Sequence, residues 1–371
     1  MTVEALTLRD FRSYERAEVV LGSGLTVVSG RNGAGKTNLL EGLYFGCVGR
    51  SCRTSNEREV VRFGAPLTRV EVRARDRHGD VHVLAVGFEP GAGKKVRVDG
   101  APVERLADSP VRPLVGVFLP DRLELVKGAP ALRRAHLDQV VAALWPTRAG
   151  TRGEYARALA QRNALLGRIR AGAASRGSLP AWDAELARHG VALMADRGQA
   201  VDNLADRFAE RAGDLGLDRA VGLRYRPRAK ATDASGLTAE LAERVDADLE
   251  RGFTGHGPHR DELVLEHDGR ELRSYGSQGE QRLALLALLA LLLAEREAVG
   301  EARGGLPLML LDDVMSELDA DRRRLLVDLL RAGGQSVITT TDLAHVPTAE
   351  DADVARLAIA NGAVLQDAKA A

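Results

Sequence analysis

The chain has 371 residues, of which 45% are hydrophobic and 28% charged, so it is long enough to bury a sizeable core. Its 52 basic and 52 acidic residues cancel, which removes net charge as an argument for nucleic-acid binding. Its two cysteines, Cys47 and Cys52, have no His or Cys cluster beside them, which argues against a disulfide framework and a zinc site. We therefore expect a globular cytoplasmic protein.

Neither export nor a membrane span is expected. The N-terminal stretch "MTVEALTLRD" lacks the basic start and apolar core of a signal peptide. The longest apolar run, from Leu283 to Ala294, is shorter than the roughly 20 residues that a membrane helix needs.

The first third of the chain predicts mostly strands. "VEALTLRDF" alternates with period two, "GLTVVSG" is a short buried run, and a glycine-rich break then precedes the helical stretch "TNLLEGLYFG". "TRVEVRAR" and "VHVLAVGF" alternate again, and "EPGAGKKVRVDG" adds a turn and another strand, which indicates an antiparallel meander. "PLVGVFLP" predicts a further buried strand that ends at Pro120.

The middle of the chain is predicted to be mainly helical. Residues 123–252 are rich in Ala and Leu at helical spacing, with interruptions at "RAGAASRGSLP" and "RYRPRAK". Strand signals return in "DELVLEHDGRELRSYG", a hairpin around Asp268 and Gly269, and helices and strands then alternate. The predicted class is α/β: a head made of residues 1–122 and 253–371, with residues 123–252 as an inserted, mainly helical arm lobe.

The strand-loop-helix near the N-terminus carries a P-loop. "GRNGAGKT" matches G-x-x-x-x-G-K-[ST] in full, through Gly30, Arg31, Asn32, Gly33, Ala34, Gly35, Lys36 and Thr37. Its glycines let backbone N–H groups curl around phosphates, Lys36 reaches the β- and γ-phosphates, and the Thr37 hydroxyl coordinates Mg²⁺. The alternative, a chance glycine-rich turn, is disfavoured by the strand before the motif and the helix after it.

The apolar run "LPLMLLDD" ends on two carboxylates, Asp312 and Asp313. A P-loop site needs an acid at the end of a neighbouring parallel strand to hold the water shell of the magnesium, and Asp312 fits this role. Asp313 is placed to act as a base or to orient water beside the γ-phosphate. Alternatively, the two aspartates cap the helix that follows.

A long segment separates the two motifs, because Asp312 follows Thr37 by 275 residues. Within it, "SQGEQ" opens a strongly apolar helix with Ser277, Gln278, Gly279 and Glu280. Such a helix start is a phosphate-facing surface that can serve a nucleotide held by another subunit. Ser277 and Glu280 also form the pattern of a capping box, and both interpretations can hold at once.

The order of P-loop, "SQGEQ", "LLLDD"-like strand and "SELD" resembles the ATP-binding-cassette heads of the structural-maintenance-of-chromosomes type, and among these the RecF family. The stretches similar to that family are "LTLRDFRSY", "GKTNLLEGLYF", "GRSCRT", "KGAPALRRAHLD" and "GPHRDEL". They cover both ends of the chain and flank the helical lobe.

The resemblance implies an ATPase with Mg²⁺ whose two heads form a homodimer around ATP. The "SQGEQ" residues of one subunit then face the nucleotide of the other, Asn38 extends the nucleotide-binding segment, and Asp319 lines the dimer interface. Asp319 is explained equally well as a helix N-cap. Thr341 stands where most cassettes place a γ-phosphate-sensing His, and Asp313 where transporters carry Glu, which predicts slow hydrolysis.

The resemblance also implies binding of double-stranded DNA near its junctions with single-stranded DNA. It implies RecR as a direct partner, and RecO and RecA as indirect partners. The implied roles are RecA loading, replication restart and SOS induction. Arginines of residues 148–176 are the candidates for phosphate contacts, foremost Arg148, Arg152, Arg157 and Arg162. A solvated helix face explains them equally well. The alternative function is an ATPase subunit or scaffold working on a protein or a transport substrate, and a nuclease is disfavoured because no metal-binding domain follows residue 360.

Overall fold

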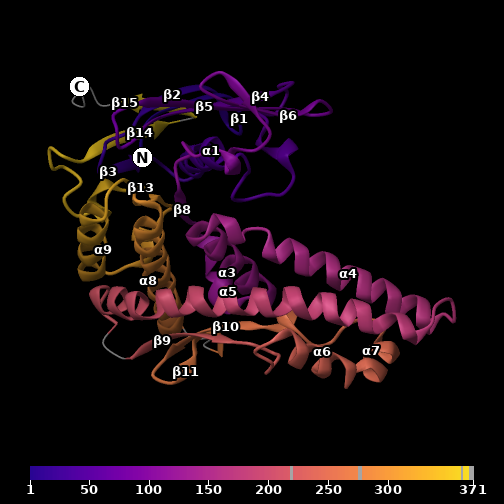
Figure 1. Cartoon of the computed structure of the whole chain (residues 1–371). Helices are drawn as coiled ribbons and strands as arrows, with labels where there is room; N and C mark the ends of the chain where they lie inside the picture. Colours follow the sequence, from indigo (N-terminus) through magenta and orange to yellow (C-terminus); the bar gives the residue numbers. More distant parts are fainter. Residues whose placement is uncertain (218–219, 275–277, 361, 367–371) are drawn as a thin grey trace. The chain divides into compact units, whose positions relative to one another are not determined.

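The computed structural model describes residues 1–217, 220–274, 278–360 and 362–366. The chain divides into two compact units (Figure 1). Unit 1 consists of Met1–Arg122 and Arg303–Ala371, and unit 2 of Leu123–Ala302. The first division falls where the sequence analysis placed it. The second falls after Ala302 instead of residue 252, because the strands and the long helix that follow residue 252 pack within unit 2. The assignment of one part as nucleotide-binding head and the other as arm stays a prediction.

Unit 1 contains an antiparallel sheet, which includes the predicted meander. Its strands follow the order β2 (Tyr14–Val20), β1 (Thr2–Phe11), β4 (Thr68–Arg75), β5 (Val81–Glu89), β6 (Gly93–Val98) and β7 (Ala101–Val103). In β4 the residues Thr68, Val70, Val72 and Ala74 are buried and those between them face outward, which is the period-two pattern of a half-buried strand. The helix α1 (Lys36–Val48) contacts β1, β4 and β5.

The second sheet of unit 1 is mostly parallel. Its order is β15 (Ala363–Gln366), β14 (Ala355–Ala360), β3 (Leu25–Ser29), β13 (Ser336–Thr340), β12 (Leu308–Leu311) and β8 (Val115–Phe118), with only β15 antiparallel to its neighbour. All residues of β12 and β13 are buried, as expected for central strands covered on both faces. The helix α9 (Ala320–Ala332) joins β12 to β13. The P-loop after β3 and the predicted acids after β12 therefore lie at the carboxyl ends of parallel strands of one sheet, with β13 between them. Ligands bind at this edge in open α/β sheets.

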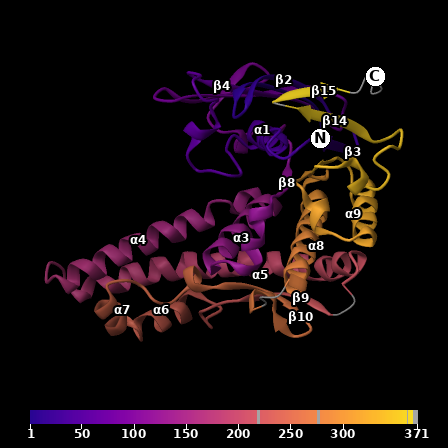
Figure 2. The same ribbon diagram turned by 180° about the vertical axis from the view of Figure 1, so that it is seen from behind.

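Unit 2 is mainly helical. Its helices are α2 (Glu124–Lys127), α3 (Pro130–Leu144), α4 (Thr151–Arg170), α5 (Leu179–Asp214), α6 (Ala234–Ala242), α7 (Val245–Arg251) and α8 (Gln278–Arg303). The last residue of α8, Arg303, belongs to unit 1. The long helices α4 and α5 lie side by side (Figure 2). A small antiparallel sheet has the order β11 (Arg270–Glu271), β10 (Glu262–His267) and β9 (Val221–Arg226). The predicted hairpin is confirmed, with Asp268 and Gly269 at its turn in the left-handed region.

The predicted α/β class, with a mixed sheet, an antiparallel meander and an inserted helical part, is confirmed. Of the helices in the described part of the chain, none combines the length and apolar character that a membrane crossing requires.

Candidate nucleotide-binding site

The P-loop connects the end of β3 to the start of α1. Gly33 and Gly35 have φ angles of 79° and 116°, in the left-handed region that glycine enters without steric cost. The N–H of Ala34 donates to the carbonyl of Arg31 at 3.1 Å, which closes the loop into a tight turn. Arg31, Asn32 and Gly33 are exposed at its tip, so the backbone N–H groups of the loop and of the first turn of α1 are accessible to an anion.

Three neighbouring segments hold the loop in this shape. The Tyr14 hydroxyl donates to the carbonyl of Gly35 at 2.9 Å, and the N–H of Gly30 donates to the carbonyl of Thr340 at 3.2 Å. Between β14 and β15, the N–H of Gly362 donates to the carbonyl of Ala34 at 3.1 Å. Burial raises the pKa of Tyr14, so its hydroxyl stays a hydrogen-bond donor at any ordinary pH.

Gly30→Ala is expected to disrupt this site. A Cβ at Gly30 would lie 2.4 Å from the carbonyl oxygen of Ile359, so either the loop or β14 must move. We expect destabilisation of about 1–3 kcal/mol and a loss of nucleotide binding, measured by thermal unfolding and by titration of a fluorescent ATP analogue. Gly24→Ala is the matched control, because a Cβ there meets nothing within 4 Å. Unchanged nucleotide affinity in Gly30→Ala would contradict the role of this close approach.

Lys36 begins α1 and is buried. Its ammonium donates to the carbonyls of Gly30 at 2.7 Å and Arg31 at 3.1 Å, so the side chain folds back across the P-loop. This is the position from which a lysine can neutralise phosphate oxygens held by the loop.

Thr37 and Asp312 meet directly, as the motif predicts. The Thr37 hydroxyl donates to Asp312 Oδ2 at 2.7 Å, and the Thr339 hydroxyl donates to Asp312 Oδ1 at 2.7 Å. Asp312 is only 5% exposed and follows β12, while Thr339 lies in the neighbouring strand β13. Thr339 therefore fixes the orientation of the carboxylate and leaves Oδ2 facing the end of the P-loop.

The Thr37 and Asp312 oxygens fit a magnesium ion. Two neighbouring ligands of an octahedral Mg²⁺ at about 2.1 Å are about 3 Å apart, close to the observed separation of these two oxygens. Both are hard oxygen donors, and Mg²⁺ usually binds one or two such protein groups and completes its shell with water and phosphate oxygens. No cluster of three or more His, Cys, Asp or Glu residues that could hold a metal occurs among the residues that the structure describes.

Asp313 has an unusual conformation and environment. Its φ of 47° places a non-glycine residue in the left-handed region, which Asp tolerates better than most residues. Its N–H donates to the Thr339 hydroxyl at 3.0 Å, whereas its buried Oδ1 has no hydrogen-bond partner in the described part of the chain. Its side chain does not cap the short 3₁₀ turn that follows, so the capping alternative fails at this residue.

Burial raises the pKa of Asp313. The Lys36 ammonium lowers this pKa, and the carboxylates of Asp312 and Glu317 raise it, with a net upward shift. A half-buried acid with an unsatisfied oxygen and a raised pKa beside a P-loop lysine has the properties of a general base.

The other predicted residues of unit 1 occupy the same edge or its surroundings. Thr341 follows β13, which pairs with β3 so that Thr340 lies opposite Ser29, and this places Thr341 beside the start of the P-loop. Asn38 donates to the Ser13 hydroxyl and accepts from Arg53, both at 3.0 Å. Asp319 accepts from the N–H of Arg322 at 3.0 Å, which confirms its interpretation as the N-cap of α9.

The "SQGEQ" segment belongs to unit 2. Ser277 lies outside the described residues, while Gln278, Gly279 and Glu280 form the first turn of α8. Their predicted role toward a partner's nucleotide stays a prediction.

Sequence reasoning missed two groups that shape the site. Thr339 orients Asp312, and nothing in "SVITTTDL" distinguishes it from the neighbouring threonines before the register is known. Glu41, in α1, is fully buried and accepts from Arg12 at 2.9 and 2.7 Å and from Arg53 at 3.1 Å. The sequence contains one hint of this cluster, the single Glu in the apolar stretch "NLLEGLYF", because a carboxylate that is buried must be paired.

The candidate DNA-binding arginines differ in their surroundings. Arg157 is exposed on α4, and Arg152 is 64% exposed and 3.3 Å from Asp138. Arg148 stacks on Trp145 and donates to Gln199 at 2.6 Å. Arg162 is a correction to the predicted set: it is fully buried and donates to Asp183 at 2.6 Å and to Asp248 at 2.7 Å, so it cannot reach DNA while unit 2 is folded.

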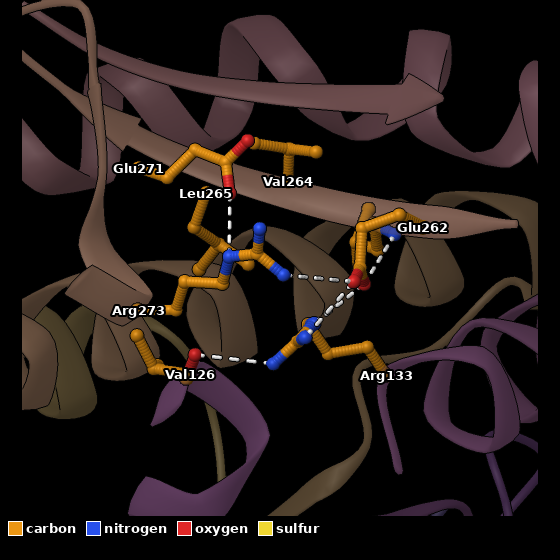
Figure 3. Close-up of a pocket in the computed structure, with 8 residues that line it drawn as sticks. Val126, Arg133, Glu262, Val264, Leu265, Glu271 and Arg273 are labelled. Carbon is orange, nitrogen blue, oxygen red and sulfur yellow. Dashed lines mark hydrogen bonds and ion pairs between the residues drawn. The ribbon is translucent and has the colours of Figure 1, made fainter. Parts of the chain in front are cut away.

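Two of the family-like stretches, "KGAPALRRAHLD" and "GPHRDEL", meet inside unit 2 (Figure 3). Arg133 forms two hydrogen bonds to Glu262, at 2.7 and 3.1 Å, and donates to carbonyls at the end of α2, including that of Val126. Arg273 approaches Glu262 to 3.7 Å and Glu271 to 2.6 Å. These residues line a small pocket and tie α2 and α3 to β10, so they stabilise the fold of unit 2.

The "GPHR" turn of unit 2 is also structural. Because His259 Nε2 must donate to the carbonyl of Thr254 at 2.9 Å, its Nδ1 accepts from the Tyr155 hydroxyl at 2.7 Å. Burial lowers the pKa of His259 to about 4, which is consistent with this neutral imidazole. Arg260 lies over the ring of Phe253 at 5.6 Å.

Comparison with known proteins gives concordant matches. A family model described as an AAA domain matches residues 5–103. DNA replication and repair protein RecF of Anaeromyxobacter sp. (strain Fw109-5) is 39% identical over 379 residues, which cover 98% of this chain and 99% of that protein. The protein of the same name from Acidothermus cellulolyticus is 39% identical, with 92% of this chain and 94% of that protein covered.

Solved structures of RecF and of an Smc head are similar in fold to this chain. A structure of the recombination mediator protein RecF-ATP in the RecFOR pathway has a TM-score of 0.86 and 26% identity, covering 99% of this chain and 98% of that chain. An Smc head bound to the C-winged helix domain of ScpA has a TM-score of 0.59 at 16% identity, covering 100% of this chain and 99% of that chain, and shows the shared fold alone.

Proposed function

Because this chain belongs to the RecF family of DNA replication and repair proteins, we propose that it is a cytoplasmic, ATP-dependent DNA-binding protein of recombinational repair. The observation that carries the proposal is the contact of Thr37 with Asp312, set beside the P-loop lysine and the unsatisfied carboxylate of Asp313. A RecF of the RecFOR pathway has been solved with ATP, which supports ATP as the nucleotide of this chain.

In the proposed site, the N–H groups of residues 30–37 and the Lys36 ammonium bind the phosphates. Thr37 and Asp312 hold Mg²⁺, which supplies charge neutralisation at the phosphates when bound. Asp313 orients the attacking water and accepts its proton, and Thr341 lies next to the loop where a γ-phosphate sensor is needed. Because Asp313 stands where transporters carry the longer Glu, we expect ATP hydrolysis to be slow and to be accelerated when DNA is bound.

The proposed cycle uses two copies of the chain. ATP joins the heads of a homodimer, with Ser277, Gln278, Gly279 and Glu280 of one copy facing the nucleotide of the other and Asp319 at the interface. This dimer binds duplex DNA next to single-stranded gaps, with Arg148, Arg152 and Arg157 among the phosphate contacts. Hydrolysis separates the heads. RecR is the proposed direct partner, through which RecO and RecA act.

The test is fluorescence anisotropy of a labelled duplex with a single-stranded gap, titrated at several salt concentrations with ATP, with ADP and without nucleotide. We expect salt-sensitive binding with ATP only, and its loss in Lys36→Ala and Ser277→Arg, because the first removes a phosphate contact and the second obstructs the dimer. Equal binding in all three nucleotide states would separate the nucleotide site from DNA. An absence of binding would favour an ATPase that works on a protein partner.

A further inference from the structure

The antiparallel sheet of unit 1 has one covered and one open face. Leu8, Val70, Val86 and Val96 lie opposite one another across four strands and are buried. Leu8 and Val70 face glycines of α1, which lies along this face of the sheet (Figure 1). Directly paired residues of an antiparallel sheet point to the same face, so the residues next to these four point to the opposite, outer face.

A row of basic residues crosses this outer face. Arg9 pairs with Arg16 of β2 and with Arg69 of β4, Arg69 pairs with Gly87 of β5, and Gly87 pairs with Lys95 of β6. We call Arg16, Arg9, Arg69 and Lys95 the basic row; all four are exposed. With strands about 4.8 Å apart, the row spans roughly 19 Å. At 3.4 Å per base pair, this is about five to six base pairs of duplex DNA.

The basic row carries an excess of positive charge. Arg16 pairs with Glu18 at 2.7 Å and Arg69 with Glu71 at 2.9 Å, along their own strands. Neither Arg9 nor Lys95 forms an ion pair with a carboxylate within the described residues. Gly87 leaves a gap between Arg69 and Lys95, because a Cβ there would meet only backbone oxygens at 3.7 Å or more. An extended anion can approach the sheet at this point.

An aromatic side chain stands at the same end of the sheet. Phe63 is 99% exposed, in the loop that enters β4. The loop is anchored beside the end of β1, where the N–H of Arg62 donates to the carbonyl of Asp10 at 2.8 Å and Val61 bridges to Phe11. The backbone next to Phe63 is thus fixed to Asp10, the residue that follows Arg9. Leu67 of the same loop is 43% exposed, so the apolar surface here is limited to this loop. An exposed aromatic ring in a loop that borders a row of cations suits stacking on a base.

We propose that the outer face of this sheet is a DNA-binding surface, in which the basic row binds duplex phosphates and Phe63 stacks on the base exposed where the duplex ends at a gap. The inference deepens the proposed function and rests on it, since it assigns the recognition of the junction to one residue. A regular row of cations matches the regular charges of a duplex, and an inserted or stacked ring is a common device at unpaired bases.

The experiment compares a gapped duplex with a continuous duplex of the same sequence, by anisotropy with ATP at several salt concentrations. Arg9→Ala combined with Lys95→Ala is expected to weaken binding of both DNAs, and to reduce the slope of log affinity against log salt by about 2. Phe63→Ala is expected to weaken binding of the gapped duplex alone, by about tenfold, and Phe63→Trp to retain it.

Matched controls separate this surface from general effects. Arg77→Ala combined with Arg324→Ala removes two exposed cations of unit 1 that lie outside the strands of this sheet, and Val20→Ala shortens an exposed apolar side chain on the outer face away from the basic row. Both should bind DNA as the unaltered protein does. Thermal unfolding and ATP-analogue binding establish that each variant is folded.

The outcomes distinguish the two levels of the proposal. If the unaltered protein binds no DNA with ATP, the proposed function itself is overturned. If it binds DNA but the row variant binds with the same affinity and salt slope, the DNA surface is overturned, and an acidic protein becomes the candidate occupant. If Phe63→Ala weakens binding of both duplexes equally, the assignment of junction recognition to Phe63 is overturned.

Discussion

Asp313→Asn is expected to lower ATP hydrolysis by about 100- to 10,000-fold while leaving nucleotide binding intact. Asn has nearly the same shape, and like Asp it accepts the left-handed backbone found at this position. It cannot take a proton from water, however. The measurement is phosphate release in a single turnover with saturating ATP, Mg²⁺ and gapped DNA, alongside the affinity for a fluorescent ATP analogue.

The same substitution is expected to stabilise the protein without nucleotide. The pKa of Asp313 is raised in the folded state, so folding disfavours its ionised form. This cost is fully present above the folded pKa and is lost as the pH falls from the folded pKa to the lower pKa of the unfolded chain. Asp313→Asn should therefore unfold at a higher temperature near neutral pH, and this gain should vanish in acid. Hydrolysis at the unaltered rate would show that another group acts as the base.

Arg162→Ala is expected to destabilise unit 2 strongly, by about 3–5 kcal/mol. The substitution leaves Asp183 and Asp248 as two buried carboxylates without their shared cation, and it also removes the hydrogen bond to Thr254. For a unit of this size the unfolding midpoint should fall by about 6–20 °C, which calorimetry or circular dichroism can measure.

Arg157→Ala is the matched control on the same helix, because that side chain is exposed and its removal should change stability by less than about 0.5 kcal/mol. A folded Arg162→Ala protein with an unchanged midpoint and weaker DNA binding would return Arg162 to the DNA-binding set.

The P-loop and its acids were predictable from the sequence because they depend on backbone geometry. Glycines at fixed spacing, a lysine and a hydroxyl define a phosphate-binding loop, and an apolar run that ends on Asp312 predicts a buried parallel strand. The structure adds Thr339, whose partner Asp312 is evident once the register of β12 and β13 is known, and the buried Glu41 with its arginine partners.

The surroundings of the arginines were not predictable in the same way. Helical spacing places Arg157 and Arg162 on different faces of α4, but it does not tell which face is covered, and abundant alanine weakens the contrast between the faces. Similarly, "RYRPRAK" was interpreted as an interruption between helices, whereas its first residues end β9, whose partner β10 lies further along the chain. Pairing over such separations leaves no local pattern.

The anchoring of the P-loop has a consequence for biosynthesis. The loop is formed by residues 30–37, but the carbonyl of Thr340, the backbone at Ile359 and the N–H of Gly362 hold it in place, and Asp312 completes it. A nascent chain that has just emerged from the ribosome carries the whole motif without its supports. Competence to bind nucleotide should therefore arise only after the residues up to Gly362 have been synthesised and have folded onto the loop.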